Sequence, residues 1–340
     1  MVKAGKEQIK QYILKLISRY ETKIVPKVVE NFGISQSTAY NYVNELKRDG
    51  IITKDEKTAE YALVSVRTPF LYRNENLSED RVFNKDIAPL LAGLDKHILS
   101  IWRYAFTEMM NNAIEHSGGE EIYVSVKTNP LETTMIVMDD GVGIFKNIQQ
   151  YLLREKGEEL PLDECVALLF SGKFTTAKSL HSGEGIFFTS HLMDQFLIYS
   201  DEETFSRSSF SDQQFQYKEL GFENGTLVLM SLNNHSKKTT KEVFDRFSDV
   251  DEGFIKTQIP IAHMFPNGSP VSRSEARRLG ELMLRFKEVD LDFSNVEEVG
   301  QAFCHELFIV WQERNPDILL KVCHANDDVQ RMISRVKNTK

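Results

Sequence analysis

The stretch Glu108-Met-Met-Asn-Asn112-Ala-Ile-Glu-His116 decides the fold of the middle of this 340-residue chain. Glu108 and Asn112 are four residues apart, so on a helix they lie on one face, about one turn from each other. The following Ser117-Gly-Gly predicts the end of that helix. Mg²⁺ prefers oxygen ligands, which the Asn112 amide can supply, and a carboxylate one turn earlier can orient and deprotonate water. These residue types therefore allow a magnesium site on the helix, although a Glu-x-x-x-Asn pair on its own is usually a solvated helix face.

Two glycine-containing segments follow this helix in the sequence. Asp139-Asp-Gly141-Val-Gly143-Ile comes after two alternating, strand-like runs, Ile122-Tyr-Val-Ser-Val and Thr134-Met-Ile-Val-Met. Gly183-Glu-Gly185 precedes the apolar run Ile186-Phe-Phe-Thr-Ser-His-Leu, which predicts a helix whose first amides can face phosphate. Glycines at these places let the backbone approach a ligand without a Cβ clash. Each segment alone is unspecific, but their order and spacing favour one nucleotide site.

Together the three segments resemble the N box, G1 box and G2 box of the GHKL ATPases: gyrase B subunits, heat-shock chaperones, histidine kinases and mismatch-repair ATPases. The resemblance implies a two-layer α/β sandwich that binds ATP and Mg²⁺. It also implies Glu108 as the catalytic base, Asn112 on the metal and Asp139 on the adenine amino group. The glycines Gly141, Gly143, Gly183 and Gly185 would line the nucleotide.

The insert between Phe145 and Gly183 has the length of an ATP lid, which we place at about residues 145–184. Its glycines and hydroxyl residues favour a loop that can order over phosphate. Candidates for phosphate contact are Lys173, Thr175 and Thr176, although loop lysines are usually solvated. Thr226, in Asn224-Gly-Thr226-Leu-Val-Leu-Met, matches the late strand that carries a threonine near the adenine in this family. A plain turn followed by a strand remains the alternative for Thr226.

The first 65 residues predict three helices and a hairpin. Apolar spacing marks a helix over residues 8–17, Pro26 lies in the first turn of a second, and Gly33 ends it. Ser35 can cap a third helix, Gln36 to Arg48, and Asp49-Gly50 turns into a two-stranded wing. This order resembles a winged helix-turn-helix domain. Polar side chains suited to base edges and phosphates would then begin the recognition helix, with basic ones later: Gln36, Ser37, Thr38, Tyr40, Asn41, Lys47 and Arg48.

From about residue 270 strands and helices alternate, which predicts a small α/β layer structure. We expect helices over 272–286, 300–311 and 327–336 and strands over 289–294 and 318–323. This order resembles the STAS fold of anti-sigma-factor antagonists, and more closely a STAS-like domain of unknown function found fused to GHKL modules. In true antagonists a serine in this region is phosphorylated. The matching stretch here, Glu298-Val-Gly300-Gln-Ala-Phe303, has no hydroxyl residue, so an interaction module without its own chemistry is favoured.

Net charge, cysteine spacing and the length of apolar runs argue against several classes of protein. The net charge of −9 argues against nonspecific nucleic-acid binding, yet residues 1–57 carry 11 Lys/Arg against 7 Asp/Glu. The three cysteines, Cys165, Cys304 and Cys323, have no metal-ligand spacing and fit reduced thiols. No apolar run is long enough for a membrane span, and the N-terminus lacks a signal-peptide core. We therefore expect a cytoplasmic protein without a membrane anchor.

These observations predict an α+β multidomain protein with three domains: a winged helix-turn-helix at 1–65, a GHKL ATP-binding domain at 66–240 and a STAS-like domain at 241–340. The leading hypothesis is a slowly ATP-hydrolysing transcription regulator that binds double-stranded DNA, with nucleotide state controlling the winged helix. A homodimer would let paired winged helices read two half-sites. Two alternatives stay open: a serine/threonine protein kinase acting on a separate STAS partner, and an ATP-stabilised scaffold with a protein partner at the C-terminal domain. The winged helix could likewise contact protein instead of DNA.

Overall fold

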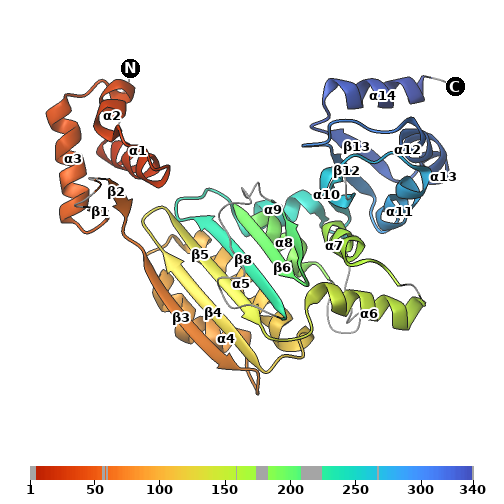
Figure 1. Ribbon diagram of the computed structural model, residues 1–340, viewed down its shortest axis with the longest axis horizontal. Helices are drawn as coiled ribbons and strands as arrows, with labels where there is room; N and C mark the ends of the chain where they lie inside the picture. Colours follow the sequence, from red (N-terminus) through yellow and green to blue (C-terminus); the bar gives the residue numbers. More distant parts are fainter. Residues whose placement is uncertain are drawn as a thin grey trace.

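The computed structural model of the protein describes residues 5–55, 58, 60–157, 159–173, 183–207, 224–265 and 268–338. Figure 1 shows an N-terminal helical module and a C-terminal α/β module on either side of a central sheet. Each of the three parts buries a hydrophobic core of its own. Among the described residues, no helix combines the length and the apolar character that crossing a bilayer requires.

The N-terminal module contains the three expected helices and the expected hairpin. The helices are α1 (Lys6–Ser18), α2 (Ile24–Phe32) and α3 (Gln36–Arg48), and the antiparallel strands are β1 (Ile52–Lys54) and β2 (Tyr61–Leu63). The Ser35 side chain accepts a hydrogen bond from Thr38 N at 3.1 Å and so caps α3 where the sequence predicts it. Ala39, Val43 and Leu46 are buried on the inner face of α3, as the helical spacing requires.

The central sheet has the strand order β3-β4-β5-β8-β6-β7, and all of these neighbouring strands pair antiparallel. The strands are β3 (Val66–Arg73), β4 (Glu121–Thr128), β5 (Glu132–Asp139), β6 (Gln195–Ser200), β7 (Glu203–Ser206) and β8 (Thr226–Asn233). The edge strand β3 is not among the strands expected from the sequence. Its residues Thr68, Phe70 and Tyr72 face the helices half-buried while their neighbours are exposed, and Pro69 is tolerated because β3 is an edge strand.

Helices cover one face of this sheet (Figure 1). The central one, α5 (Lys96–His116), buries Trp102, Phe106, Met109 and Ala113 at helical spacing, which turns Glu108 and Asn112 toward its other side. Before α5, helix α4 (Glu79–Val82) continues through a π-helical turn (Phe83–Ile87) and a 3-10 turn (Ala88–Leu91). The expected helix after Gly183 is α8 (Gly185–Leu192).

The segment expected as a loop over the phosphates contains two helices, α6 (Ile144–Lys156) and α7 (Leu162–Ser171). Phe145, Ile148 and Leu152 of α6 are buried in the central core. These apolar residues recur every three or four positions, so burial of one face explains why the segment is helical. Residues 174–182 lie outside the described part of the chain.

The C-terminal module is built on the parallel sheet β11-β12-β13, formed by β11 (Lys256–Pro260), β12 (Glu288–Asp292) and β13 (Leu319–Cys323). Its helices are α10 (Ile261–Met264), α11 (Arg273–Met283), α12 (Gln301–His305), α13 (Gln312–Arg314) and α14 (Asp327–Lys337), with a π-helical turn (Glu306–Trp311) between α12 and α13. The expected strands and helices are present, whereas β11 was missed. Helix α9 (Thr240–Phe247) and the short hairpin β9 (Ser248–Asp249) and β10 (Gly253–Phe254) link this module to β8.

Candidate functional site

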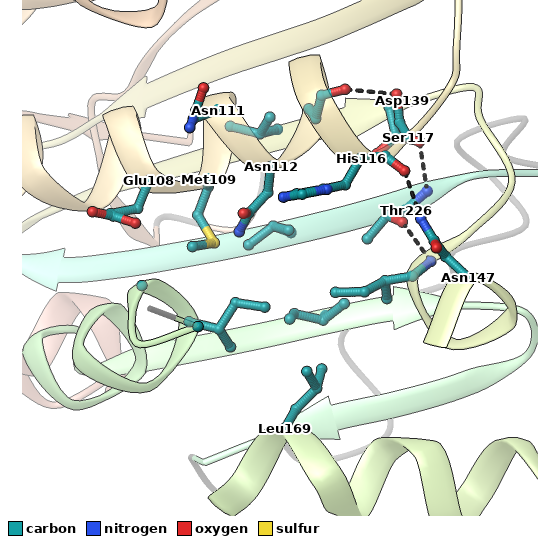
Figure 2. A pocket seen from close by; sticks show the side chains of 18 of the residues that line it. Glu108, Met109, Asn111, Asn112, His116, Ser117, Asp139, Asn147, Leu169 and Thr226 are labelled. Atoms are coloured by element: carbon teal, nitrogen blue, oxygen red, sulfur yellow. Dashed lines mark hydrogen bonds between the residues drawn. The ribbon is translucent and has the colours of Figure 1, made fainter. Parts of the chain in front are cut away.

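A cavity of about 440 Å³ lies between α5, the end of the central sheet and the first turn of α8. Figure 2 shows side chains from α5, β5, β8 and α6 converging on it. Seven residues singled out in the sequence line it: Glu108, Asn112, Asp139, Gly143, Gly183, Gly185 and Thr226. They come from four separate stretches of the chain, so the fold brings the three sequence segments and Thr226 into one site.

Helix α5 presents Glu108, Asn112 and His116 to the cavity on successive turns. The Glu108 carboxylate lies against the first turn of α8, since a Cβ on Gly185 would overlap its Oε2. A side chain at position 185 would therefore displace the Glu108 carboxylate. Burial, together with the nearby charges of Glu108 and Glu184, raises the pKa of Tyr104 one turn before Glu108. The wall formed by α5 and α8 is thus negatively charged, which suits a bound cation.

Asp139 ends β5 and is only 6% exposed. Its Oδ1 accepts backbone hydrogen bonds from Gly141 N at 3.0 Å and Thr226 N at 3.3 Å. Burial raises the pKa of this carboxyl to about 6, although both hydrogen bonds act in the opposite direction. Both bonds end on one oxygen, so a ligand's N–H donor would bond Oδ2. An amino group of a purine is a donor of this kind.

Three glycines near Asp139, Gly141, Gly143 and Gly225, allow close packing or a positive φ of the backbone, and of these Gly143 lines the cavity. A Cβ on Gly141 would overlap the Ser117 carbonyl, so Gly141 is required for close packing against the end of α5 and does not line the cavity. Gly143 has φ +93° and precedes α6, a conformation that favours glycine. Gly225, with φ +97°, allows β8 to approach the Asp139 carbonyl. From the sequence, Gly225 was expected only as part of a turn before a strand.

Further polar residues that the sequence analysis missed hold the start of α6. Ile144 N donates to Thr226 Oγ1 at 3.0 Å and to Ser200 Oγ at 3.2 Å. Asp201 accepts a hydrogen bond from Lys146 N at 3.2 Å and pairs with the Lys146 side chain. Asn147 donates to the His116 carbonyl at 2.7 Å and lines the cavity (Figure 2). No local pattern marks these residues, because their partners are distant in the sequence.

Of the expected phosphate contacts, Lys173 is described by the structure and does not line the cavity. Thr175 and Thr176 lie outside the described residues. Lys173 Nζ donates to the Arg285 carbonyl at 3.1 Å and lies over the Phe254 and Phe286 rings. Burial there lowers the pKa of the Lys173 ammonium. In this arrangement Lys173 contacts the C-terminal module.

The polar side chains expected at the recognition helix are placed along α3. Gln36, Ser37, Tyr40, Asn41, Lys47 and Arg48 are exposed, and Thr38 is half-buried. The Thr38 hydroxyl lies 2.8 Å from Ser35 Oγ, so it takes part in the cap of the helix. The exposed residues therefore offer a polar surface with two basic side chains in the last turn.

Two family models match the chain. Residues 100–215 match the model described as histidine kinase-, DNA gyrase B- and HSP90-like ATPase. Residues 275–330 match a STAS-like domain of unknown function. No curated protein is similar enough to be matched with the chain. The GHKL ATPase domain and the STAS-like domain expected from the sequence are thus confirmed, and this family generally binds ATP with Mg²⁺.

We expect the substitution Asp139→Asn to remove ATP binding while the protein stays folded. The amide would turn an NH₂ group toward the backbone N–H donors or toward the adenine amino group, and a buried donor would be left unpaired, at a cost of about 1–3 kcal/mol. Calorimetric titration with Mg-ATP measures the loss. The neighbouring exposed carboxylate gives the matched control, Asp140→Asn, which should bind ATP as the unmodified chain does. Unchanged affinity in Asp139→Asn would refute the role of this residue.

ATP affinity should fall at acidic pH because the adenine amino group needs an ionised Asp139. The pKa of about 6 in the nucleotide-free protein places the change just below neutral pH. Below pH 6 the carboxyl binds a proton that ATP must displace, so the dissociation constant should rise up to about tenfold per pH unit. Titrations between pH 5 and 8 measure this slope. A flat profile in the unmodified chain and in Asp140→Asn would contradict it.

Proposed function

Because the chain carries a GHKL-type ATPase domain beside a STAS-like domain, we propose that it is an ATP-binding, slowly ATP-hydrolysing transcription regulator that binds double-stranded DNA. The observation that carries the nucleotide part is the convergence of Glu108, Asn112, Asp139, Gly185 and Thr226 on one cavity. The N-terminal module is the DNA-binding part of the proposal. Nucleotide in the cavity controls how this module acts on DNA.

Each cavity residue has a separate role in this proposal. Asp139 Oδ2 accepts the hydrogen bond of the adenine amino group, while its Oδ1 stays bonded to the backbone. The first amides of α8 face the phosphates, where the helix dipole favours negative charge. The Asn112 amide oxygen would hold Mg²⁺, which would neutralise phosphate charge when bound. Glu108, one turn away, orients and deprotonates the attacking water.

The DNA-binding part of the proposal is supported by the exposed face of α3 and by local charge. Residues 1–57 carry 11 Lys/Arg against 7 Asp/Glu in a chain with a net charge of −9. Gln36 and Asn41 can form paired hydrogen bonds with adenine edges, and Lys47 and Arg48 can contact phosphates. A helix exposed in this way, followed by the β1–β2 hairpin, fits a winged helix-turn-helix that enters the major groove.

Hydrolysis should depend on Glu108. We expect Glu108→Gln to lower the rate of phosphate release by about 10²-fold or more, since a general base contributes that much, while ATP still binds. Glu115→Gln, at an exposed position on the same helix, is the matched control and should keep the rate of the unmodified chain. Single-turnover phosphate release with Mg-ATP measures both. Equal rates in the two variants would remove Glu108 from the proposed mechanism.

DNA affinity should depend on the last turn of α3. We expect the double variant Lys47→Ala/Arg48→Ala to bind DNA more weakly and to lower the slope of log affinity against log salt by about 0.9 per lost phosphate contact. Selection of genomic fragments with and without Mg-ATP supplies the site for these titrations. Lys127→Ala, on the exposed face of β4, is the control. No enrichment of any fragment in either condition would contradict DNA binding.

A protein kinase is the second candidate, because a STAS-like domain accompanies the ATPase domain in this chain. Glu108 would then activate a hydroxyl of a separate STAS partner instead of water. The stretch Glu298–Phe303 has no hydroxyl residue, which disfavours transfer to that position in its own domain. Incubation with γ-labelled ATP separates the two candidates: label released as phosphate supports the ATPase, and label on a second protein supports the kinase.

A further inference from the structure

Helix α8 contacts both the cavity and the core of the C-terminal module. Its first residues, Gly185 and Ile186, line the cavity. The next two, Phe187 and Phe188, are buried in the hydrophobic core of the C-terminal module, together with residues of β11, α11 and β12. Any displacement of the start of α8 is therefore transmitted to the packing of the STAS-like domain, because buried cores have discrete packing arrangements.

The junction consists of aromatic rings in mutual contact, which we call the aromatic seam: Phe187, Phe188, Phe244, Phe247, Phe254 and Phe286. Phe188 stacks on Phe244 of α9 with centroids 4.1 Å apart and 2° between the ring planes. Phe254 lies 4.7 Å from Phe187 and 5.3 Å from Phe286, so it joins α8 to the end of α11. On the cavity side, Tyr104 of α5 meets Phe244 edge-on at 5.2 Å. The seam thus runs from the helix of Glu108 to the STAS-like domain.

The C-terminal end of α7 makes a second connection to the same domain. Lys173 Nζ donates to the Arg285 carbonyl at 3.1 Å, and an Arg285 N–H donates to the Lys173 carbonyl at 2.6 Å. Glu164 of α7 pairs with Arg278 of α11. A Cβ on Gly172 would overlap the Phe187 ring, so the end of α7 also packs against the seam. Two helices that line the cavity, α7 through Leu169 and α8 through Gly185 and Ile186, therefore contact the STAS-like domain.

The N-terminal module contacts the central sheet at a different place from the STAS-like domain. Strand β2 ends at Leu63 and β3 of the central sheet begins at Val66, which leaves only two residues between them. Leu131, in the turn between β4 and β5, is 6% exposed and belongs to the core of the N-terminal module. Gln11 Nε2 and His235 Nε2 lie 3.1 Å apart. These contacts join the module to the far end of the sheet, away from α7 and α8 (Figure 1).

From these contacts we propose that the STAS-like domain is the element that responds to nucleotide, through the aromatic seam and α7, while the N-terminal module stays fixed to the ATPase sheet. The inference rests on the proposed function for ATP binding in the cavity. Nucleotide changes the position of the STAS-like domain, and this position in turn alters DNA binding. The connection between the N-terminal module and the sheet does not act as a hinge. Such coupling requires that nucleotide bind the two arrangements with different affinity.

Two distances in the full-length protein test this assignment. Spin labels at Lys127→Cys and Arg331→Cys measure the distance between the sheet and the STAS-like domain. Labels at Lys127→Cys and Glu30→Cys measure the distance between the sheet and the N-terminal module. All three label positions are exposed, and Cys323→Ser leaves Cys165 and Cys304, which are buried. Saturation with Mg-ATP or a non-hydrolysable analogue should shift the Lys127/Arg331 distance distribution beyond its nucleotide-free width. The Lys127/Glu30 distribution should stay unchanged.

A substitution in the aromatic seam tests whether the seam couples the cavity to the STAS-like domain. Phe254→Ala should abolish the nucleotide-dependent shift and, because coupling is reciprocal, change the ATP dissociation constant by about fivefold or more. Phe254→Leu should restore part of both effects. Phe265→Ala is the matched control, since Phe265 packs against Phe303 inside the same domain at 5.7 Å. It should keep the nucleotide-dependent shift and the ATP affinity of the unmodified chain.

The outcomes separate the inference from the proposed function. If displacement of a fluorescent nucleotide shows that ATP occupies the site and the Lys127/Arg331 distribution does not shift, the inference is wrong and ATP binding stands. A shift in the Lys127/Glu30 distribution instead would assign the response to the N-terminal module. If ATP does not bind at all, the proposed function fails and the inference fails with it.

Discussion

The candidate site depends on the buried carboxylate of Asp139 and its two backbone donors. One oxygen bonds Gly141 N in the turn after β5 and Thr226 N at the start of β8, so a single side chain joins three segments of the chain. A buried carboxylate is costly unless it is hydrogen-bonded, which makes these contacts necessary for the local fold. The same arrangement directs the remaining acceptor capacity of Asp139 to the cavity. Asp139 therefore supports the local fold through Oδ1 and leaves Oδ2 for recognition.

The second constraint is the shared helix α8, which gives the cavity and the STAS-like domain one rigid wall. Ring pairs such as Phe188 with Phe244 and Phe187 with Phe254 each contribute about 0.5–1.5 kcal/mol beyond buried area. Several such pairs hold the domain against the site, so nucleotide can alter its position only by a comparable difference in binding free energy. The N-terminal module, attached through β3 and Leu131, is not part of this seam in the described chain.

Much of this structure could be predicted from the sequence where the signals are local. The bounds of α3 and its Ser35 cap, the helix of Glu108 and Asn112, and the Asp139 turn all follow from spacing and capping patterns. Strand β3 was missed because it lies at the sheet edge, and its half-buried alternation includes Pro69 and Arg73. Asn147, Ser200, Asp201 and the aromatic seam were missed because their partners are far away in the sequence. Burial of α6 and α7 likewise depends on tertiary packing.

The measurement that tests the central claim most directly compares Mg-ATP with Mg-ITP in calorimetric titrations of the unmodified chain. Inosine carries a carbonyl oxygen where adenine carries the amino group, so it would place an acceptor against the Asp139 carboxylate. We expect ATP to bind and ITP to bind about tenfold more weakly or worse. Equal affinity for the two nucleotides would contradict recognition of adenine by Asp139 in this cavity.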